Sequence, residues 1–345
     1  MTWITWRQFR AQGITAAALI AAVGAVLLVS GLSLAHSYSV SVASCGGPRA
    51  CASAANGFIN QMKGTPTELI FYAGIVLVYL APAFIGMFWG APLLARELEA
   101  GTLRLAWNQS VSRTRWMVAK LGLVGLAAMT TAGLLSLFTG WWAAPVYRAA
   151  DLAGLDSFSF TRLAPPLFGA QGIVPVGYAA FAFALGVTAG LLFRRTIPAM
   201  AVTLAGFGLI QLAWPNWIRP RLVTPLREYF PITPANFSAL VVMNNTKFVV
   251  QRSISKAGAW VVSNQTVGPA GRPFSGPPTR ACLNVNSSPG ACSASIGPLH
   301  LRALISYVPA GRFWGLQWIE VAVYLLLAAA LAWFCVLRVR RRSFG

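Results

Sequence analysis

The chain has 345 residues, of which 57% are hydrophobic and only 10% are charged, and its formal net charge at pH 7 is +20. Its mean hydropathy of +0.63 and several apolar runs of the roughly 20 residues that cross a bilayer exclude an ordinary soluble domain and indicate an all-α polytopic membrane protein. Basic residues beside spans orient helices and meet anionic headgroups, so membrane lipid is an expected partner. Because no nucleic-acid recognition motif accompanies the positive charge, nucleic acid is not an expected partner.

Six apolar runs are long enough to be transmembrane helices. The apolar core of the first, of roughly 20 residues, exceeds the 7–15 residues of a signal peptide, which predicts a retained span. The fifth is bounded by Pro198 and Pro215, which predicts a bend or an incomplete crossing. The predicted spans are Ile14–Ala35, Leu69–Leu94, Val118–Trp142, Ile173–Phe193, Ile197–Trp214 and Leu316–Leu337.

Aromatic and basic residues alternate before the first span. Trp3, Trp6 and Phe9 recur at helical spacing, with Arg7 and Arg10 among them. This pattern predicts a short N-terminal interfacial helix in the membrane surface. An aromatic and basic anchor is the alternative interpretation.

Lys and Arg gather on one side of the predicted spans. In short loops these residues collect on the cytoplasmic side, which predicts a multi-pass protein of the bacterial plasma membrane with both termini in the cytoplasm. The outer short loops then carry only Arg49, Lys63, Arg148 and Arg162. The residues on the predicted inner side are Arg7, Arg10, the cluster from Arg96 to Lys120, Arg194, Arg195, Arg338, Arg340, Arg341 and Arg342.

Composition divides the chain into three parts. Residues 1–215 hold five spans and an inner charged segment, 95–117, while 316–345 hold the last span and a basic tail. Between them, 216–315 is rich in Asn, Ser, Pro, Gly and Thr around short β-like runs, which predicts a small mixed, β-containing extracytoplasmic loop domain. Its small hydrophobic content makes it marginal alone, so we expect it to pack against the membrane part or a partner subunit.

Four of the five cysteines fall in loops that are predicted to face outward. Disulfides persist in an oxidising compartment, so we predict the bridges Cys45–Cys51 and Cys282–Cys292, with free thiols as the alternative. Zinc is disfavoured because the chain has only two histidines, and no metal site is predicted.

Two further features lie inside the predicted spans. The pairs Gly86/Gly90 and Gly186/Gly190 have the small-xxx-small spacing that brings helix backbones together, either between subunits or within one chain. Glu320 lies at the outer end of the last span, where a carboxylate should be paired, and Arg312 is a plausible partner.

The sequence lacks the residues for a catalytic site of its own. There is no H-E-x-x-H motif, and two isolated histidines do not support a Ser/His/Asp arrangement. There is also no Walker A motif, so any energy from ATP must come from another protein. The near absence of carboxylates within the spans also disfavours a proton- or sodium-coupled carrier.

The segment from Ala95 to Lys120 reads ARELEAGTLRLAWNQSVSRTRWMVAK. It resembles the first inner loop of the membrane subunits of type-2 (ABC-2) ABC exporters, which has an acidic and basic helix, Gly-Thr-Leu, a Ser-Arg turn and a basic residue that opens the third span. The residues in those places are Arg96, Glu97, Glu99, Gly101, Thr102, Leu103, Ser112, Arg113 and Lys120. The long outer loop departs from the short helical hairpin of many relatives.

The resemblance implies an exporter made of two permease chains, identical or homologous, and two cytoplasmic P-loop ATPase subunits. ATP and Mg would be bound by the ATPase subunits, and no cofactor by this chain. The resemblance implies that the inner loop docks on the ATPase. The docking residues would be Arg96, Glu97, Glu99, Gly101, Thr102, Arg104 and Arg113. A charged inner loop that is only a solvated face is the alternative.

The substrate path would lie between the two permease chains, beside aromatic residues of the second span. These residues are Phe71, Tyr79, Phe84, Phe88 and Trp89. The same side chains could face lipid. Walls without charges fit a hydrophobic drug, a lipid or an amphipathic peptide.

Two other classes of function stay open at this point. One is a membrane sensor or assembly factor whose outer loop domain binds a ligand, and the other is a secondary transporter. Recruitment of a P-loop ATPase distinguishes the exporter from both.

Overall fold

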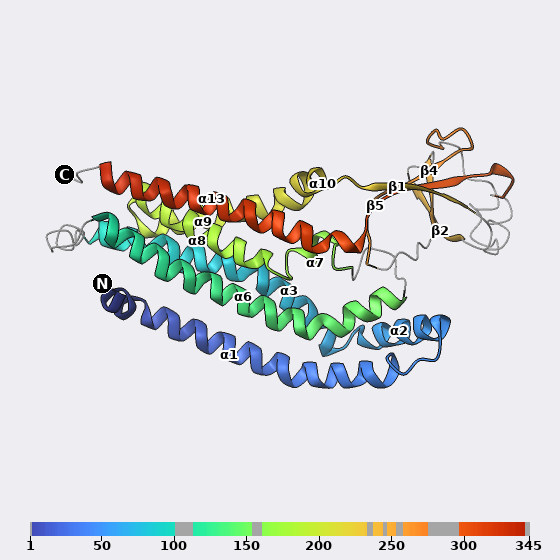
Figure 1. Cartoon of the computed structure of the whole chain (residues 1–345), viewed down its shortest axis with the longest axis horizontal. Helices are drawn as coiled ribbons and strands as arrows, with labels where there is room; N and C mark the ends of the chain where they lie inside the picture. The colour runs from blue at the N-terminus through green and yellow to red at the C-terminus, as the bar shows by residue number, and fades with distance from the viewer. Residues whose placement is uncertain are drawn as a thin grey trace.

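The computed structural model describes residues 2–100, 113–153, 161–232, 237–243, 247–252, 258–274 and 297–341. Six helices in these ranges are long and apolar enough to cross a membrane, which confirms the predicted polytopic all-α architecture. Figure 1 shows them as one elongated bundle, in which α1 (Thr2–Ser41) begins and α13 (Phe313–Arg341) ends at the same end. We call this the termini end, and the opposite end the sheet end.

The first and third spans are long continuous helices. The backbone of residues 2–13 is helical, as predicted, but it continues directly into the first span as part of α1. The third span is α6 (Arg113–Ala153), of 41 residues. Between them in sequence, α2 (Pro48–Met62) packs beside α6 through Ala55, Phe58, Ile59 and Met62. The sequence analysis did not predict α2.

The second span is a rod of three joined segments. It consists of α3 (Pro66–Ile85), the π-helical segment η1 (Gly86–Gly90) and α4 (Ala91–Glu99). The amide of Ala91 donates to the carbonyl of Gly86, five residues earlier. Pro92 has no amide hydrogen to donate to the carbonyl of Phe88, and the side chain of Gln12 in α1 donates to it instead, at 3.2 Å.

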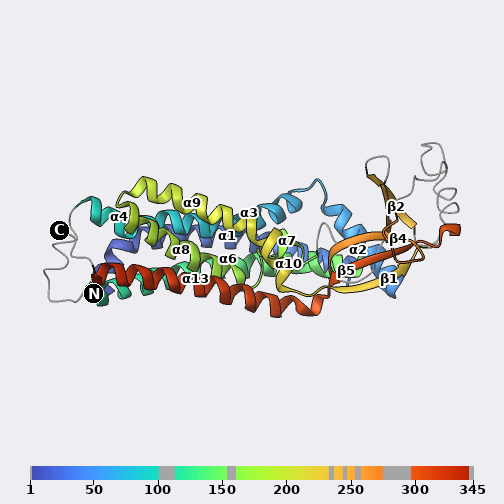
Figure 2. The ribbon, with the colours of Figure 1, turned by 90° about the horizontal axis from the view of Figure 1, so that it is seen from above.

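The fourth span, α8 (Val174–Phe193), is the centre of the bundle. In its candidate membrane window, 78% of the residues are buried, against 17–33% in the other five spans. Such a helix can have apolar and small residues on all faces. Helices α3, α4, α6, α9 (Thr196–Ala213) and α13 all contact it, and Figure 2 shows it among the other helices.

Glycines make the contact between α8 and the second span very close. A Cβ atom on Gly186 would lie 2.2 Å from the carbonyl oxygen of Gly86, and one on Gly190 would lie 2.4 Å from that of Ala91. A Cβ on Gly90 would lie 2.6 Å from the carbonyl oxygen of Phe183. Both predicted small-xxx-small pairs therefore serve packing within one chain.

The fifth span continues beyond its predicted end. After α9, the chain passes through a second π-helical segment, η2 (Trp214–Ile218), into α10 (Arg219–Leu222). The 27 residues from Thr196 to Leu222 give about 40 Å of helix at 1.5 Å per residue, which is enough to cross a hydrocarbon core of about 30 Å.

A small antiparallel sheet projects from the sheet end, in agreement with the predicted β-containing loop (Figure 1). Its strand order is β1 (Leu226–Pro231), β5 (Arg302–Val308), β4 (Trp260–Val267), with Leu226 opposite Tyr307 and Trp260 opposite Val308. Strands β2 (Phe237–Met243) and β3 (Lys247–Arg252) form a separate pair. The short helices α7 (Pro165–Phe168) and η5 (Ala310–Arg312) lie just before α8 and α13.

One of the two predicted disulfides is confirmed. Cys45 and Cys51 are bonded across the turn between α1 and α2, with 5.1 Å between their Cα atoms. Cys282 and Cys292 lie outside the described residues, so their bridge stays a prediction. Cys335 is a free, buried thiol in α13.

Replacing Gly186 with alanine should destabilise the bundle, because the added methyl group meets backbone that cannot move independently. We expect a loss of about 1–3 kcal/mol in the free energy of unfolding, as for other overpacked cores. Gly208→Ala in α9 is the matched control, because a Cβ there meets nothing within 4 Å, and it should be neutral or stabilising by up to about 1 kcal/mol. Unfolding in detergent measures both, and equal effects would contradict the close contact.

Candidate functional site

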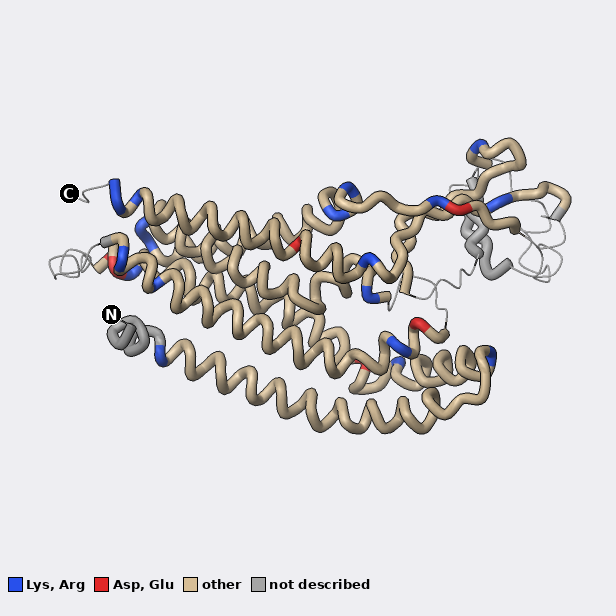
Figure 3. Tube along the Cα trace, viewed as in Figure 1, with Lys and Arg blue, Asp and Glu red and all other residues tan. Residues whose placement is uncertain are grey.

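The predicted ATPase-docking residues that the structure describes lie at the termini end. Arg96, Glu97 and Glu99 occupy the last turn of α4, and Figure 3 shows acidic and basic residues gathered there, near both termini. The other predicted docking residues, which are Gly101, Thr102, Arg104 and the side chain of Arg113, lie outside the described residues.

Glu97 joins the end of α4 to the beginning of α6. Its carboxylate forms an ion pair with the ammonium group of Lys120, and the two side chains are 19% and 4% exposed, respectively. The same ammonium group lies 4.4 Å from the centre of the Trp116 ring. The ion pair therefore bridges the two ends of the charged inner segment.

Glu99 joins α4 to the beginning of α9. Its carboxylate accepts a hydrogen bond from the backbone amide of Thr196 at 2.8 Å and another from the Thr196 hydroxyl at 2.7 Å. A carboxylate at a helix N-terminus satisfies free amides and interacts favourably with the helix dipole. Both acidic residues thus have partners within the chain, and their contact with an ATPase stays a prediction.

The five aromatic residues predicted for the substrate path lie in three places. Phe71 is buried against the ring of Tyr147, with 6.0 Å between centroids, and Tyr79 stacks on Tyr178 at 6.2 Å. Phe84, Phe88 and Trp89 instead line a groove between α1 and the second span. The structure brings only these three together.

A buried ion pair joins the fifth span to the sixth. Two nitrogens of the Arg219 guanidinium donate to the Glu320 carboxylate at 3.1 and 3.0 Å, and both side chains are 1% exposed. The Tyr178 hydroxyl donates to the same carboxylate at 2.9 Å, and the guanidinium also donates to the carbonyl of Pro165 at 3.2 Å. The partner of Glu320 is therefore Arg219.

The expectation that Arg312 pairs with Glu320 is wrong. Arg312 lies in the exposed η5 segment and donates to the carbonyl of Thr224 at 2.9 Å. The sequence analysis missed Arg219 because it placed this residue in the outer loop, beyond the end of the fifth span. The signal that could have revealed it is the need of a buried carboxylate for a buried cation.

Gln317 fixes the entry into the central helix. Its side-chain oxygen accepts from the amides of Ile173 and Val174 at 3.0 and 3.1 Å, and its nitrogen donates to the carbonyl of Phe168 at 3.1 Å. Gly172 makes this approach possible, since a Cβ there would lie 2.7 Å from the Gln317 oxygen. The sixth span therefore caps α8 and holds the turn that precedes it.

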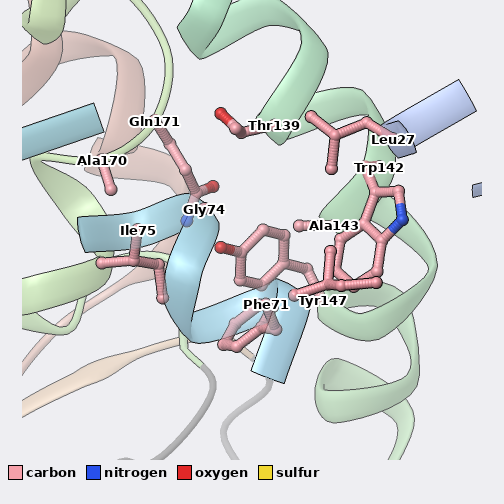
Figure 4. A pocket seen from close by; sticks show the side chains of 11 residues that line it. Leu27, Phe71, Gly74, Ile75, Thr139, Trp142, Ala143, Tyr147, Ala170 and Gln171 are labelled. Carbon is pink, nitrogen blue, oxygen red and sulfur yellow. The ribbon is translucent and has the colours of Figure 1, made fainter. Parts of the chain in front are cut away.

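A small cavity lies between α1, α3 and α6 (Figure 4). Its volume is about 20 Å³, and Thr139, Tyr147 and Gln171 bring polar groups to an otherwise apolar lining. A water molecule needs at least about 10–15 Å³ by this measure. The space is thus the size of one water molecule and is too small for a transported substrate.

The buried polar groups brace the helices against one another. Neither Arg219 nor Glu320 lines any of the four cavities described for this part of the chain. Within the described ranges, no group of three or more His, Cys, Asp or Glu residues could hold a metal ion. The fold and these contacts define a multi-pass, α-helical membrane protein in which the last turn of α4 is joined to α6 and α9.

Comparison with known families places the chain more specifically. It belongs to the ABC-2 membrane transporter related family, whose model matches residues 17–219, more than half of the sequence. The match runs through the first five spans and ends at Arg219. It makes the chain a membrane-transporter permease, in a family whose members are typically non-catalytic subunits associated with an ABC ATPase. No curated protein and no solved structure matches the chain.

Removing Arg219 should leave the Glu320 carboxylate buried without a cation. We expect Arg219→Ala to lower the free energy of unfolding by about 3–5 kcal/mol, whereas the double change Arg219→Met with Glu320→Leu should recover most of that loss. Denaturation of the purified chain in detergent measures this. Arg312→Ala is the control and should cost about 1 kcal/mol or less, because its hydrogen bond is exposed. An Arg219→Ala variant as stable as this control would contradict the bracing role.

Proposed function

We propose that this chain is the permease subunit of an ATP-driven exporter. Two permease chains would form the transmembrane pathway, and separate cytoplasmic subunits would bind Mg and ATP and hydrolyse the ATP. The substrate would be hydrophobic or amphipathic, such as a drug, a lipid or a peptide, because the cavities beside the spans have mostly apolar walls.

The observation that carries the proposal is the fixation of the inner segment. Glu97 binds the beginning of α6 through Lys120, and Glu99 binds the beginning of α9 through Thr196. A push on the segment between α4 and α6 would therefore act on the ends of three spans together. Such rigid coupling is what an ATPase needs to convert its own closure into movement of a permease.

The close packing behind α4 supports the same mechanism. Gly190 contacts the backbone of Ala91, and Gly186 contacts the backbone of Gly86. Backbones in direct contact cannot slide without changing partners, so α4 and the central helix should move as a unit. Movement at the termini end would then reach α13 through its extensive contact with α8.

Reversing the charge at Glu97 should uncouple the permease from its ATPase. In Glu97→Lys, two cations face each other where an ion pair stood, so we expect the stimulation of ATP hydrolysis in lipid vesicles to fall several-fold. Restoring the pair in the opposite sense, with Lys120→Glu added, should recover most of it. Glu68→Lys, at the other end of the same rod, is the control.

Two results would contradict the role of this pair. One is a chain that binds no P-loop ATPase during purification, which would favour a sensor or a secondary transporter. The other is an uncoupling in Glu97→Lys that the double variant does not repair.

The bond between Glu99 and Thr196 should affect transmission more than docking. Thr196→Val removes the hydroxyl donor but keeps the size of the side chain, so the ATPase should still co-purify while its stimulation falls. Thr130→Val is the matched control, since the Thr130 hydroxyl bonds only to Leu126 of its own helix on an exposed face. Loss of co-purification in Thr196→Val alone would show that this contact belongs to the docking surface.

A further inference from the structure

A long groove separates the termini half of α1 from the second span. Towards the sheet end, α1 packs tightly on α6, where a Cβ on Gly31 would lie 2.8 Å from the Trp141 ring and where Trp142 donates to the Ser30 hydroxyl at 2.9 Å. Towards the termini end, the side chain of Gln12 crosses the groove and donates a hydrogen bond to the carbonyl of Phe88. The helix is therefore attached near both ends of the groove.

The groove is large and continuous. A cavity of about 500 Å³ lies beside Gln12, Phe84 and Phe88, within the range of about 300–1,000 Å³ that is typical of ligand sites. A second cavity of about 310 Å³ shares Val23 and Leu77 with it and reaches Leu27. From Gln12 to Leu27, the groove follows about 22 Å of helix, compared with about 15 Å for half of a hydrocarbon core.

The lining is apolar apart from the hydroxyl groups of Thr131 and Thr139 and the polar residues at the termini end. The Thr15 hydroxyl donates to the carbonyl of Gln12 at 2.9 Å, and the Gln12 amide is occupied by Phe88, so these polar groups already have partners. Among the described residues that line the groove, Arg96 is the charged one. The groove thus has a long hydrocarbon-like wall and a cation at one end.

The Arg96 guanidinium has no ion-pair partner among the described residues. The ion pairs among the described residues are those of Lys120 with Glu97 and of Arg219 with Glu320. The carboxylates nearest to Arg96 in sequence, on Glu97 and Glu99, are bound to Lys120 and Thr196, and Glu99 attracts the Arg96 guanidinium through space without forming a salt bridge with it. Because a guanidinium binds phosphate oxygens in a bidentate manner, Arg96 is available for an anionic headgroup.

We propose that the groove between α1 and the second span is a binding site for an anionic phospholipid of the surrounding leaflet. The phosphate is held by Arg96, and an acyl chain follows the groove past Phe84 and Leu77 towards Leu27. A larger space of about 900 Å³ on the other side of α1 has no charged lining residue in the described part of the chain, so it offers no equivalent headgroup site. The site requires only this chain and the membrane, and it is independent of the proposed ATPase.

Photolabelling tests this site without any ATPase. The purified chain is placed in vesicles that contain phosphatidylglycerol or phosphatidylcholine with a photoactivatable group on the acyl chain, and labelled peptides are mapped by mass spectrometry. Labels should fall on residues 15–27 and 70–85, with about tenfold more from phosphatidylglycerol, as expected for one charge-assisted contact.

Two variants separate the headgroup contact from the groove. Arg96→Gln should remove the preference for phosphatidylglycerol at these residues, whereas Arg341→Gln, which removes another exposed charge from the same end of the bundle, should keep it. Ala81→Trp fills the groove, because Ala81 lines it, and should reduce labelling by both lipids at 15–27.

Other outcomes would overturn the proposal. Equal labelling by the two lipids in the unaltered chain would remove the role of Arg96. Equal losses in Arg96→Gln and Arg341→Gln would indicate general surface charge rather than a site. Weak labelling at 15–27 by both lipids would mean that something else, such as a second copy of the chain, covers the groove.

Discussion

Backbone groups inside hydrocarbon have no water to bind, and this constraint explains where the chain places its buried polar side chains. Regular helix satisfies most of the backbone, so polar side chains are needed where that regularity ends. Gln317 binds two amides at the beginning of α8, and Gln12 binds the Phe88 carbonyl that Pro92 leaves free. The Arg219 guanidinium similarly binds the carbonyl of Pro165 in α7. The bonds of Gln317 and Gln12 each join two spans, and the bond of Arg219 joins the fifth span to the short helix before α8. The same bonds therefore satisfy the backbone and hold the bundle together.

The central helix connects the two ends of the molecule. Near the termini end, α8 touches the backbone of α4 through its glycines, and near the sheet end its first turn is capped by Gln317 of α13. Tyr178, one turn into α8, reaches the Glu320 carboxylate that binds Arg219. Displacement of α4 therefore reaches α13 through a single packed element, and the polar centre keeps the fifth and sixth spans in register at the opposite end.

The sequence was sufficient for the spans and the Cys45–Cys51 bridge, because each has a local signal. Apolar runs predict membrane helices directly, and two cysteines six residues apart need no long-range information. Helix α2 had a signal too, since Phe58, Ile59 and Met62 recur at helical spacing, but the sequence analysis did not use it. The partners of Glu97, Glu99 and Glu320 are 23, 97 and 101 residues away, and only packing decides such pairs.

The last turn of α4 brings three different contacts together because successive residues on a helix point about 100° apart. Arg96 lines the groove beside α1, Glu97 binds α6, and Glu99 binds α9. Rotation or translation of this turn would therefore change the width of the groove at the same time as it pulls on two spans. At the termini end of the groove, α1 is held by a side-chain hydrogen bond from Gln12, whereas α8 is held by glycine contacts between backbones that leave no space. We therefore expect α1 to adjust its position more easily than α8. A lipid in the groove would thus favour particular positions of α4, which couples the composition of the membrane to the segment on which the proposed ATPase acts.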